Sequence, residues 1–100
     1  MTFTDFSTSE KIVIRANRES LYGMDALKLR DFAKSKIQEN PRPLHLDFSQ
    51  TKYLDSVAVG GLFDLYATFR KFNCRIVIDG ASESVRRLLK NLTLDRILVM

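Results

Sequence analysis

The stretch Leu44-His45-Leu46-Asp47-Phe48 alternates apolar and polar side chains, which is the pattern of a strand with one buried face. The segments Lys11–Ala16 and Cys74–Asp79 repeat this alternation. In both of them one parity is wholly apolar: Ile12, Ile14, Ala16, Cys74, Ile76 and Ile78. A parallel sheet covered on both faces would need apolar residues at nearly every position. We therefore predict that the helices pack mainly on one face of the sheet.

Three segments between and after these strands have helical spacing of their apolar residues, namely Met24–Ile37, Ser56–Phe72 and a helix that starts at Ser82. The apolar stripes are Ala26, Leu29, Ala33 and Ile37; Ala58, Leu62, Leu65, Phe69 and Phe72; and Val85, Leu88, Leu89 and Leu92. Leu94–Leu98 fits a last helical turn, and Phe3–Ser7 fits an edge strand. The order predicts one α/β domain over residues 1–100, with a mostly parallel or mixed sheet of four to five strands and right-handed crossovers.

The charge of the chain does not point to one class of partner. The formal net charge is +4, but Lys and Arg are scattered among Asp and Glu. The densest basic cluster is Arg86-Arg87 with Lys90, for which a solvated helix face is the simpler interpretation. An acidic protein partner stays open, and we expect no direct binding of nucleic acid.

The chain also lacks the usual signals for export. Cys74 is the only cysteine, so no internal disulfide can form, and the first residues contain no basic region followed by an apolar run. No apolar stretch is long enough to span a bilayer. We expect a cytoplasmic protein that does not insert into membranes.

Few residues point to catalysis. The sequence contains no Gly-rich phosphate loop and one histidine, His45, on the polar parity of a predicted strand. Asp47, Asp55 and Asp79 lie where strand ends and turns favour aspartate for other reasons. We expect neither enzymatic activity nor a bound cofactor or metal ion.

The junction Tyr53-Leu54-Asp55-Ser56 is the candidate site. A hydroxyl at the carboxyl end of a strand and the start of a helix is close to unpaired amide groups, and the positive helix end favours an anion. A phosphate on Ser56 would add about −1.5 to −2 charges there. On spacing alone, Asp55 or Ser56 as a simple N-cap is the commoner interpretation. Gly60 and Gly61 weaken the helix and suggest close backbone approach by another element or by a partner.

Segment 44–98 resembles the STAS domain, the fold of the bacterial anti-sigma factor antagonists. The matching motifs are Leu46-Asp47-Phe48-Ser49, Tyr53-Leu54-Asp55-Ser56, Arg75-Ile76-Val77-Ile78, Ser82–Leu89 and Leu94-Asp95-Arg96-Ile97-Leu98. The resemblance implies that Ser56 is phosphorylated by an anti-sigma factor that is a serine kinase. The unphosphorylated antagonist would bind that kinase and free a sigma factor, and the phosphate would end the interaction. Where the family usually reads Asp-Ser-Ser-Gly, this chain has Asp55-Ser56-Val57-Ala58.

The resemblance also implies a set of site residues. Asp55 would orient the phosphorylation site and help the kinase to recognise it. The partner surface would comprise Val57, Ala58, Val59, Ser82 and Glu83. Any ATP and Mg²⁺ would belong to the kinase. The alternative is an accessory subunit of an ABC transporter of the lipid-transport type, which docks on the transporter ATPase without a phosphorylation switch.

Overall fold

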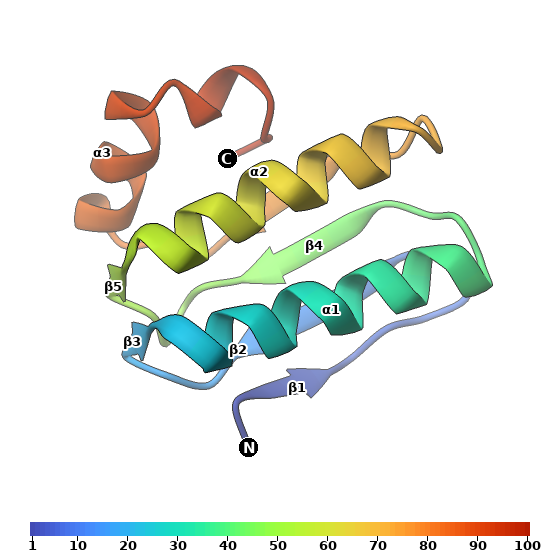
Figure 1. Ribbon diagram of the computed structural model, residues 1–100, viewed down its shortest axis with the longest axis horizontal. Helices are drawn as coiled ribbons and strands as arrows, with labels where there is room; N and C mark the ends of the chain where they lie inside the picture. Colours follow the sequence, from blue (N-terminus) through green and yellow to red (C-terminus); the bar gives the residue numbers. More distant parts are fainter.

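Strands and helices alternate along the chain in the computed structural model, which describes residues 1–100 (Figure 1). The strands are β1 (Phe3–Asp5), β2 (Ile12–Ala16), β3 (Ser20–Leu21), β4 (Leu44–Asp47), β5 (Tyr53–Leu54) and β6 (Ile76–Asp79). The helices are α1 (Gly23–Glu39), α2 (Ser56–Arg70), α3 (Glu83–Asn91) and the 3₁₀ turn η1 (Leu94–Arg96). The predicted α/β architecture is confirmed.

The main sheet has four strands in the order β1-β2-β4-β6. Strands β2, β4 and β6 are parallel, and β1 is an antiparallel edge strand, so the sheet is mixed. The register places Ile14 beside Leu46 and Leu46 beside Ile78. Near the end of the chain, Val99 forms a single parallel bridge to Val77 in β6. The prediction of an edge strand over Phe3–Ser7 is confirmed for its first three residues.

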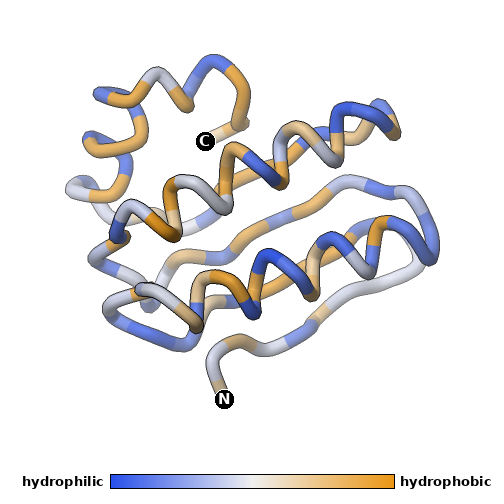
Figure 2. Tube along the Cα trace, viewed as in Figure 1, coloured by the Kyte–Doolittle hydropathy of each residue, from blue (hydrophilic) through white to orange (hydrophobic).

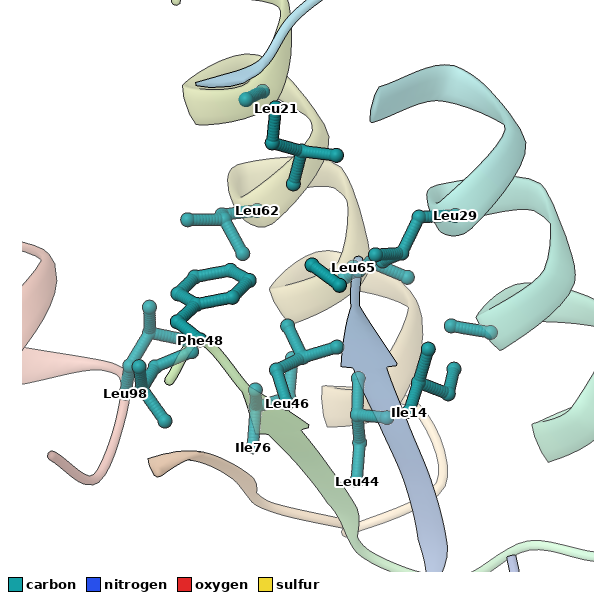
Figure 3. Close-up of a cluster of buried hydrophobic side chains, with 14 of the residues drawn as sticks. Ile14, Leu21, Leu29, Leu44, Leu46, Phe48, Leu62, Leu65, Ile76 and Leu98 are labelled. Atoms are coloured by element: carbon teal, nitrogen blue, oxygen red, sulfur yellow. The ribbon is translucent and has the colours of Figure 1, made fainter. Parts of the chain in front are cut away.

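One face of the sheet carries the hydrophobic core, as the alternation predicted. Ile14, Leu44 and Leu46 are fully buried, and they meet Leu29 from α1 and Leu65 from α2 (Figure 3). Helices α1 and α2 lie side by side over this face (Figure 1). On the opposite face, His45 in β4 contacts Asp79 in β6, with 3.0 Å between Nδ1 and Oδ2.

The ends of the elements differ from the prediction where apolar residues lie just outside a helix or strand. Phe72 follows the end of α2 and is 38% exposed, and Leu92 follows α3 and is 39% exposed. Because the chain turns at both places, helical spacing no longer directs these side chains into the core. Cys74 precedes β6 and is only half-buried. The two-residue strands β3 and β5 are too short to show a period-two pattern.

The edge strand β1 is fastened to α1 through Asp5. Its carboxylate accepts a hydrogen bond of 2.8 Å from the Ser7 amide and lies 3.5 Å from Lys36 Nζ. Partial burial raises the pKa of Asp5, but the hydrogen bonds from Ser7 and the Lys36 charge lower it by more, so the net pKa is below its ordinary value. None of the helices has both the length and the apolar character that crossing a bilayer requires.

Candidate functional site

A small corner built from β3 and β5 positions the start of α2. The two strands pair in parallel, with Ser20 beside Tyr53 and Leu21 beside Leu54. The backbone amides of Lys52 and Tyr53 both donate to Glu19 O, at 2.8 and 3.0 Å. The buried Thr51 hydroxyl donates to Arg18 O at 2.8 Å. These bonds hold the loop after β4 firmly against the loop after β2, so the backbone that enters α2 is well fixed.

Both carboxylate oxygens of Asp55 accept hydrogen bonds from helix ends. Oδ1 accepts from the Ala58 amide at 2.9 Å, which makes Asp55 the N-cap of α2. Oδ2 accepts from the Gly23 amide at 2.9 Å, and Gly23 is the first residue of α1. Tyr22, the N-cap residue of α1, makes no side-chain cap of its own. Asp55 therefore caps two helices at once, and its carboxylate is engaged inside the molecule.

Ser56 is the first residue of α2, and it is exposed. Its side chain makes none of the hydrogen bonds found in the structure, so the hydroxyl is exposed and has no partner within the chain. Val57 and Val59 are half-buried and pack against the core, whereas Ala58 is only 6% exposed and is part of it. Ala58, which the sequence placed in the partner surface, is thus inaccessible, because its position in the first turn points toward the sheet.

Three large exposed side chains lie on the segments that meet at this start of α2, and the sequence patterns did not single them out. Tyr22 is 48% exposed, Met24 67% and Tyr53 52%. Tyr53 alternates with the inward-facing Leu54 along β5, and Tyr22 and Met24 flank Gly23, which is bonded to Asp55. We call Tyr22, Met24, Tyr53 and Ser56 the β3–β5 corner. The only local sequence feature that could have indicated this corner is Tyr53 beside the apolar Leu54 in the two-residue strand β5.

Ser82 and Glu83 start the second helix that was assigned to the site. The Ser82 hydroxyl accepts from the Val85 amide at 3.2 Å, so the predicted N-cap is confirmed. Glu83 is exposed and pairs with Arg87 at 2.8 Å. Helix α3 contacts β5, so its start lies at the same end of the molecule as the β3–β5 corner (Figure 1).

The glycines of α2 are not in close contact with another element of this chain. A Cβ on Gly60 would meet nothing within 4 Å, and one on Gly61 would lie 3.8 Å from Arg30 Cβ. The sequence suggested close approach by the backbone of another element or of a partner, and within this chain no other backbone comes that close to either glycine. The apolar space between α1 and α2 that includes Gly61 holds only about 10 Å³. No cluster of three or more His, Cys, Asp or Glu side chains could hold a metal ion.

Comparison with solved structures shows the same fold in regulators and in a transporter. The anti-sigma factor antagonist SpoIIAA in its unphosphorylated form superposes with a TM-score of 0.79 at 18% identity, covering 97% of this chain and 85% of that one. A candidate anti-sigma factor antagonist of Thermotoga maritima gives 0.84 at 17% identity, covering 97% and 83%. The murine anion transporter Slc26a9 gives 0.66 at 16% identity, covering 89% of this chain and 16% of the transporter.

The sequence comparisons identify the family. No curated protein sequence matches the chain. A family model described as "Mlab, STAS domain" matches residues 7–100. This match covers nearly the whole chain, it includes the Asp55-Ser56 junction, and it agrees with the mixed sheet and the three helices. The chain belongs to the STAS domain family.

Proposed function

We propose that this protein is an anti-sigma factor antagonist that works as a phosphorylation-controlled binding switch. In its unphosphorylated form it would bind an anti-sigma factor that is a serine kinase, and thereby release a sigma factor for transcription. Phosphorylation of Ser56 by that kinase would end the interaction. The protein itself would catalyse nothing, since ATP and Mg²⁺ belong to the kinase, and the exchange would take place in the cytoplasm.

The observation that carries this proposal is the placement of Ser56. It is exposed at the first position of α2, its backbone is held by the Asp55 cap, and the exposed Tyr22, Met24 and Tyr53 lie on the segments that meet there. Membership of the STAS family and the likeness of fold to anti-sigma factor antagonists support it. Tyrosine and methionine are enriched at protein interfaces, where charged groups are depleted.

The chemistry of the β3–β5 corner gives a physical reason for a switch. The only carboxylate at its centre, Asp55, already accepts two hydrogen bonds from helix ends. A phosphate on Ser56 would add about −1.5 to −2 charges beside the exposed Tyr22, Met24 and Tyr53 side chains of the corner. The start of α2 tolerates that charge because the helix dipole is positive there. A partner surface that packs on Tyr22 and Tyr53 would have to desolvate the phosphate, which is costly.

The test starts with the histidine-kinase-like anti-sigma factors encoded in the same genome. Each is purified and incubated with the wild-type chain and ATP, and phosphate on Ser56 is sought by mass spectrometry. Binding is then measured for Ser56→Ala, which should bind as well as the wild type or for longer, and for Ser56→Asp, which should bind at least about tenfold more weakly. Ser9→Ala serves as the control, since it removes an exposed hydroxyl that makes no hydrogen bond and lies beside Asn40, just past the far end of α1.

Two results would contradict the proposal. One is equal binding by Ser56→Ala and Ser56→Asp together with no phosphate on Ser56 in protein taken from cells. The other is stable binding to the ATPase of an ABC transporter, unaffected by either change. The second result would establish the accessory-subunit alternative.

A further inference from the structure

Helix α3 has two sharply different faces. Val85 and Leu89 are buried in the core, at 2% and 0% exposure. Arg86, Arg87 and Lys90 are exposed on the other side. Figure 2 shows this as hydrophobic and hydrophilic colours that alternate around the turns of α3. The helix is therefore anchored firmly by one side while its basic side faces solvent.

The basic side of α3 is short of negative partners. Glu83 pairs with Arg87 at 2.8 Å, but neither Arg86 nor Lys90 makes an ion pair or a side-chain hydrogen bond. Asp95, in the adjoining η1 turn, makes no ion pair with them either. By contrast, two cations of α1 face two carboxylates: Arg30 pairs with Asp31 at 2.8 Å and with Asp64 at 3.6 Å, and Lys34 pairs with Asp64 at 3.1 Å. Three cations and one carboxylate leave the α3 face with a net charge of +2.

The composition of this face suits an anionic ligand. The exposed side chains of Glu83, Arg86, Arg87, Lys90 and Asn91 form one polar surface on α3. Guanidinium groups form paired, planar hydrogen bonds with carboxylates. Because α3 contacts β5, helix α3 lies at the same end of the molecule as the β3–β5 corner (Figure 1).

We propose that the outer face of α3, formed by Arg86, Arg87 and Lys90, binds an acidic segment of the protein partner that docks at the β3–β5 corner. This inference rests on the proposed function for the identity of that partner, but the basic face is tested without it. Duplex nucleic acid is less suited, since specific complexes neutralise many phosphates. An anionic bilayer is less suited too, since polybasic lipid sites use about four to eight cations.

A shared end of the molecule also links this face to the Ser56 switch. The phosphate on Ser56 would carry about −1.5 to −2 charges, which nearly cancels the net charge of the α3 face. Phosphorylation would then weaken binding of the partner in two ways: by the cost of desolvating the phosphate at the corner, and by electrostatic repulsion of the acidic segment. Salt weakens the repulsion, because charges are screened over about 8 Å at physiological ionic strength, but it does not remove the desolvation cost.

The experiment uses the whole, unphosphorylated chain and a fluorescent oligoglutamate peptide. Binding is followed by fluorescence anisotropy at low and physiological ionic strength, and amide shifts are mapped by NMR. Arg86→Glu with Lys90→Glu should weaken binding by at least about tenfold. The matched control, Lys11→Glu with Lys28→Glu, makes the same change of charge at two exposed, unpaired lysines and should stay within about twofold. Melting temperatures confirm that all variants fold.

The outcomes separate the two proposals. Peptide shifts confined to α3 and a large loss only in the α3 variant support the basic face. An equal loss in the control variant, shifts spread over the surface, or tighter binding of duplex DNA or phosphatidylserine vesicles to α3 would overturn it. Because this assay contains no kinase and no phosphate, such a failure leaves the Ser56 proposal standing. Conversely, a Ser56 that is never phosphorylated does not affect the peptide result.

Discussion

Helices α2 and α3 start in the same way, yet only one of these starts is tied to the rest of the fold. In each, a capping side chain accepts a hydrogen bond from the amide three residues later: Asp55 from Ala58 and Ser82 from Val85. Asp55 has a second oxygen, which reaches Gly23 at the start of α1, 32 residues away. Apart from the bond from Val85, the Ser82 hydroxyl contacts only the Ser84 hydroxyl, 3.1 Å away in the same first turn.

This difference teaches that a cap has a local part and a tertiary part. The local part is the hydrogen bond to the amide three residues later. It depends on a few adjacent residues, and it is of the same kind at both helix starts. The tertiary part makes the start of α2 a junction of α1, α2 and the β3–β5 pair. Ser56 is thus presented on a rigid frame, whereas the start of α3 is held by its own cap and by its buried residues.

The largest expected loss of stability comes from a charge placed in the core that both helices pack on. Leu46→Asp places an unpaired carboxylate where exposure is 0%, beneath α2. The free energy of unfolding should fall by more than about 4 kcal/mol, and the chain should fail to fold at room temperature. His45→Asn, on the open face of the same strand, should cost at most about 1 kcal/mol. Urea unfolding followed by circular dichroism measures both, and an unchanged midpoint for Leu46→Asp would refute the strand parity.

The next test separates the two parts of the Asp55 cap. Asp55→Ala removes both hydrogen bonds and should cost about 2–3 kcal/mol. Asp55→Asn keeps one carbonyl for Ala58 but turns an amide donor toward the Gly23 amide, so it should cost about half as much. Urea unfolding gives both values. If Asp55→Asn is as stable as the wild type, the bond to Gly23 contributes nothing and the contrast with α3 is lost.

A smaller effect is expected at the other cap. Ser82→Ala removes the single hydrogen bond to the Val85 amide and should cost about 1 kcal/mol. Amide hydrogen exchange should quicken in the first turn of α3 and stay unchanged in α1 and α2. Faster exchange in α1 would show that the start of α3 is not independent, which contradicts the comparison.

The smallest effect concerns the exposed ion pair beside that cap. Glu83 and Arg87 are 87% and 66% exposed and lie one helical turn apart. Glu83→Gln should therefore lower the free energy of unfolding by only about 0.3–0.5 kcal/mol, and less at high salt. Thermal unfolding at two salt concentrations measures it. A loss above about 1 kcal/mol would mean that α3 depends on this pair more than on its cap.

The sequence predicted those features that repeat along the chain. Alternation placed Leu44 and Leu46 in the core and His45 outside, and helical spacing located all three helices to within a few residues. The cap by Ser82 was predictable because its partner is only three residues away. The resemblance to the STAS family, carried by motifs from residue 44 onward, agreed with the family match.

Features that depend on distant pairs were not predictable. The bond from Gly23 to Asp55 joins residues that share no local pattern, and β3 and β5 are strands only because they meet each other. For the same reason the exposed Tyr22 and Met24 could not be associated with Ser56. Ala58 was assigned to the partner surface because an apolar residue in the first turn of a helix fits either a core or an interface. Only its burial in the structure shows that it belongs to the core.

The bond from the Gly23 amide to the Asp55 carboxylate has a practical consequence. An amide proton held by a charged acceptor forms a strong hydrogen bond, and its NMR resonance is sensitive to that acceptor. Gly23 is one of four glycines in the chain, so its signal is easily assigned. A charge added to the neighbouring Ser56 would displace that signal, although the modified residue lies in a different helix. One glycine peak could therefore report, without any attached label, what fraction of the protein carries phosphate.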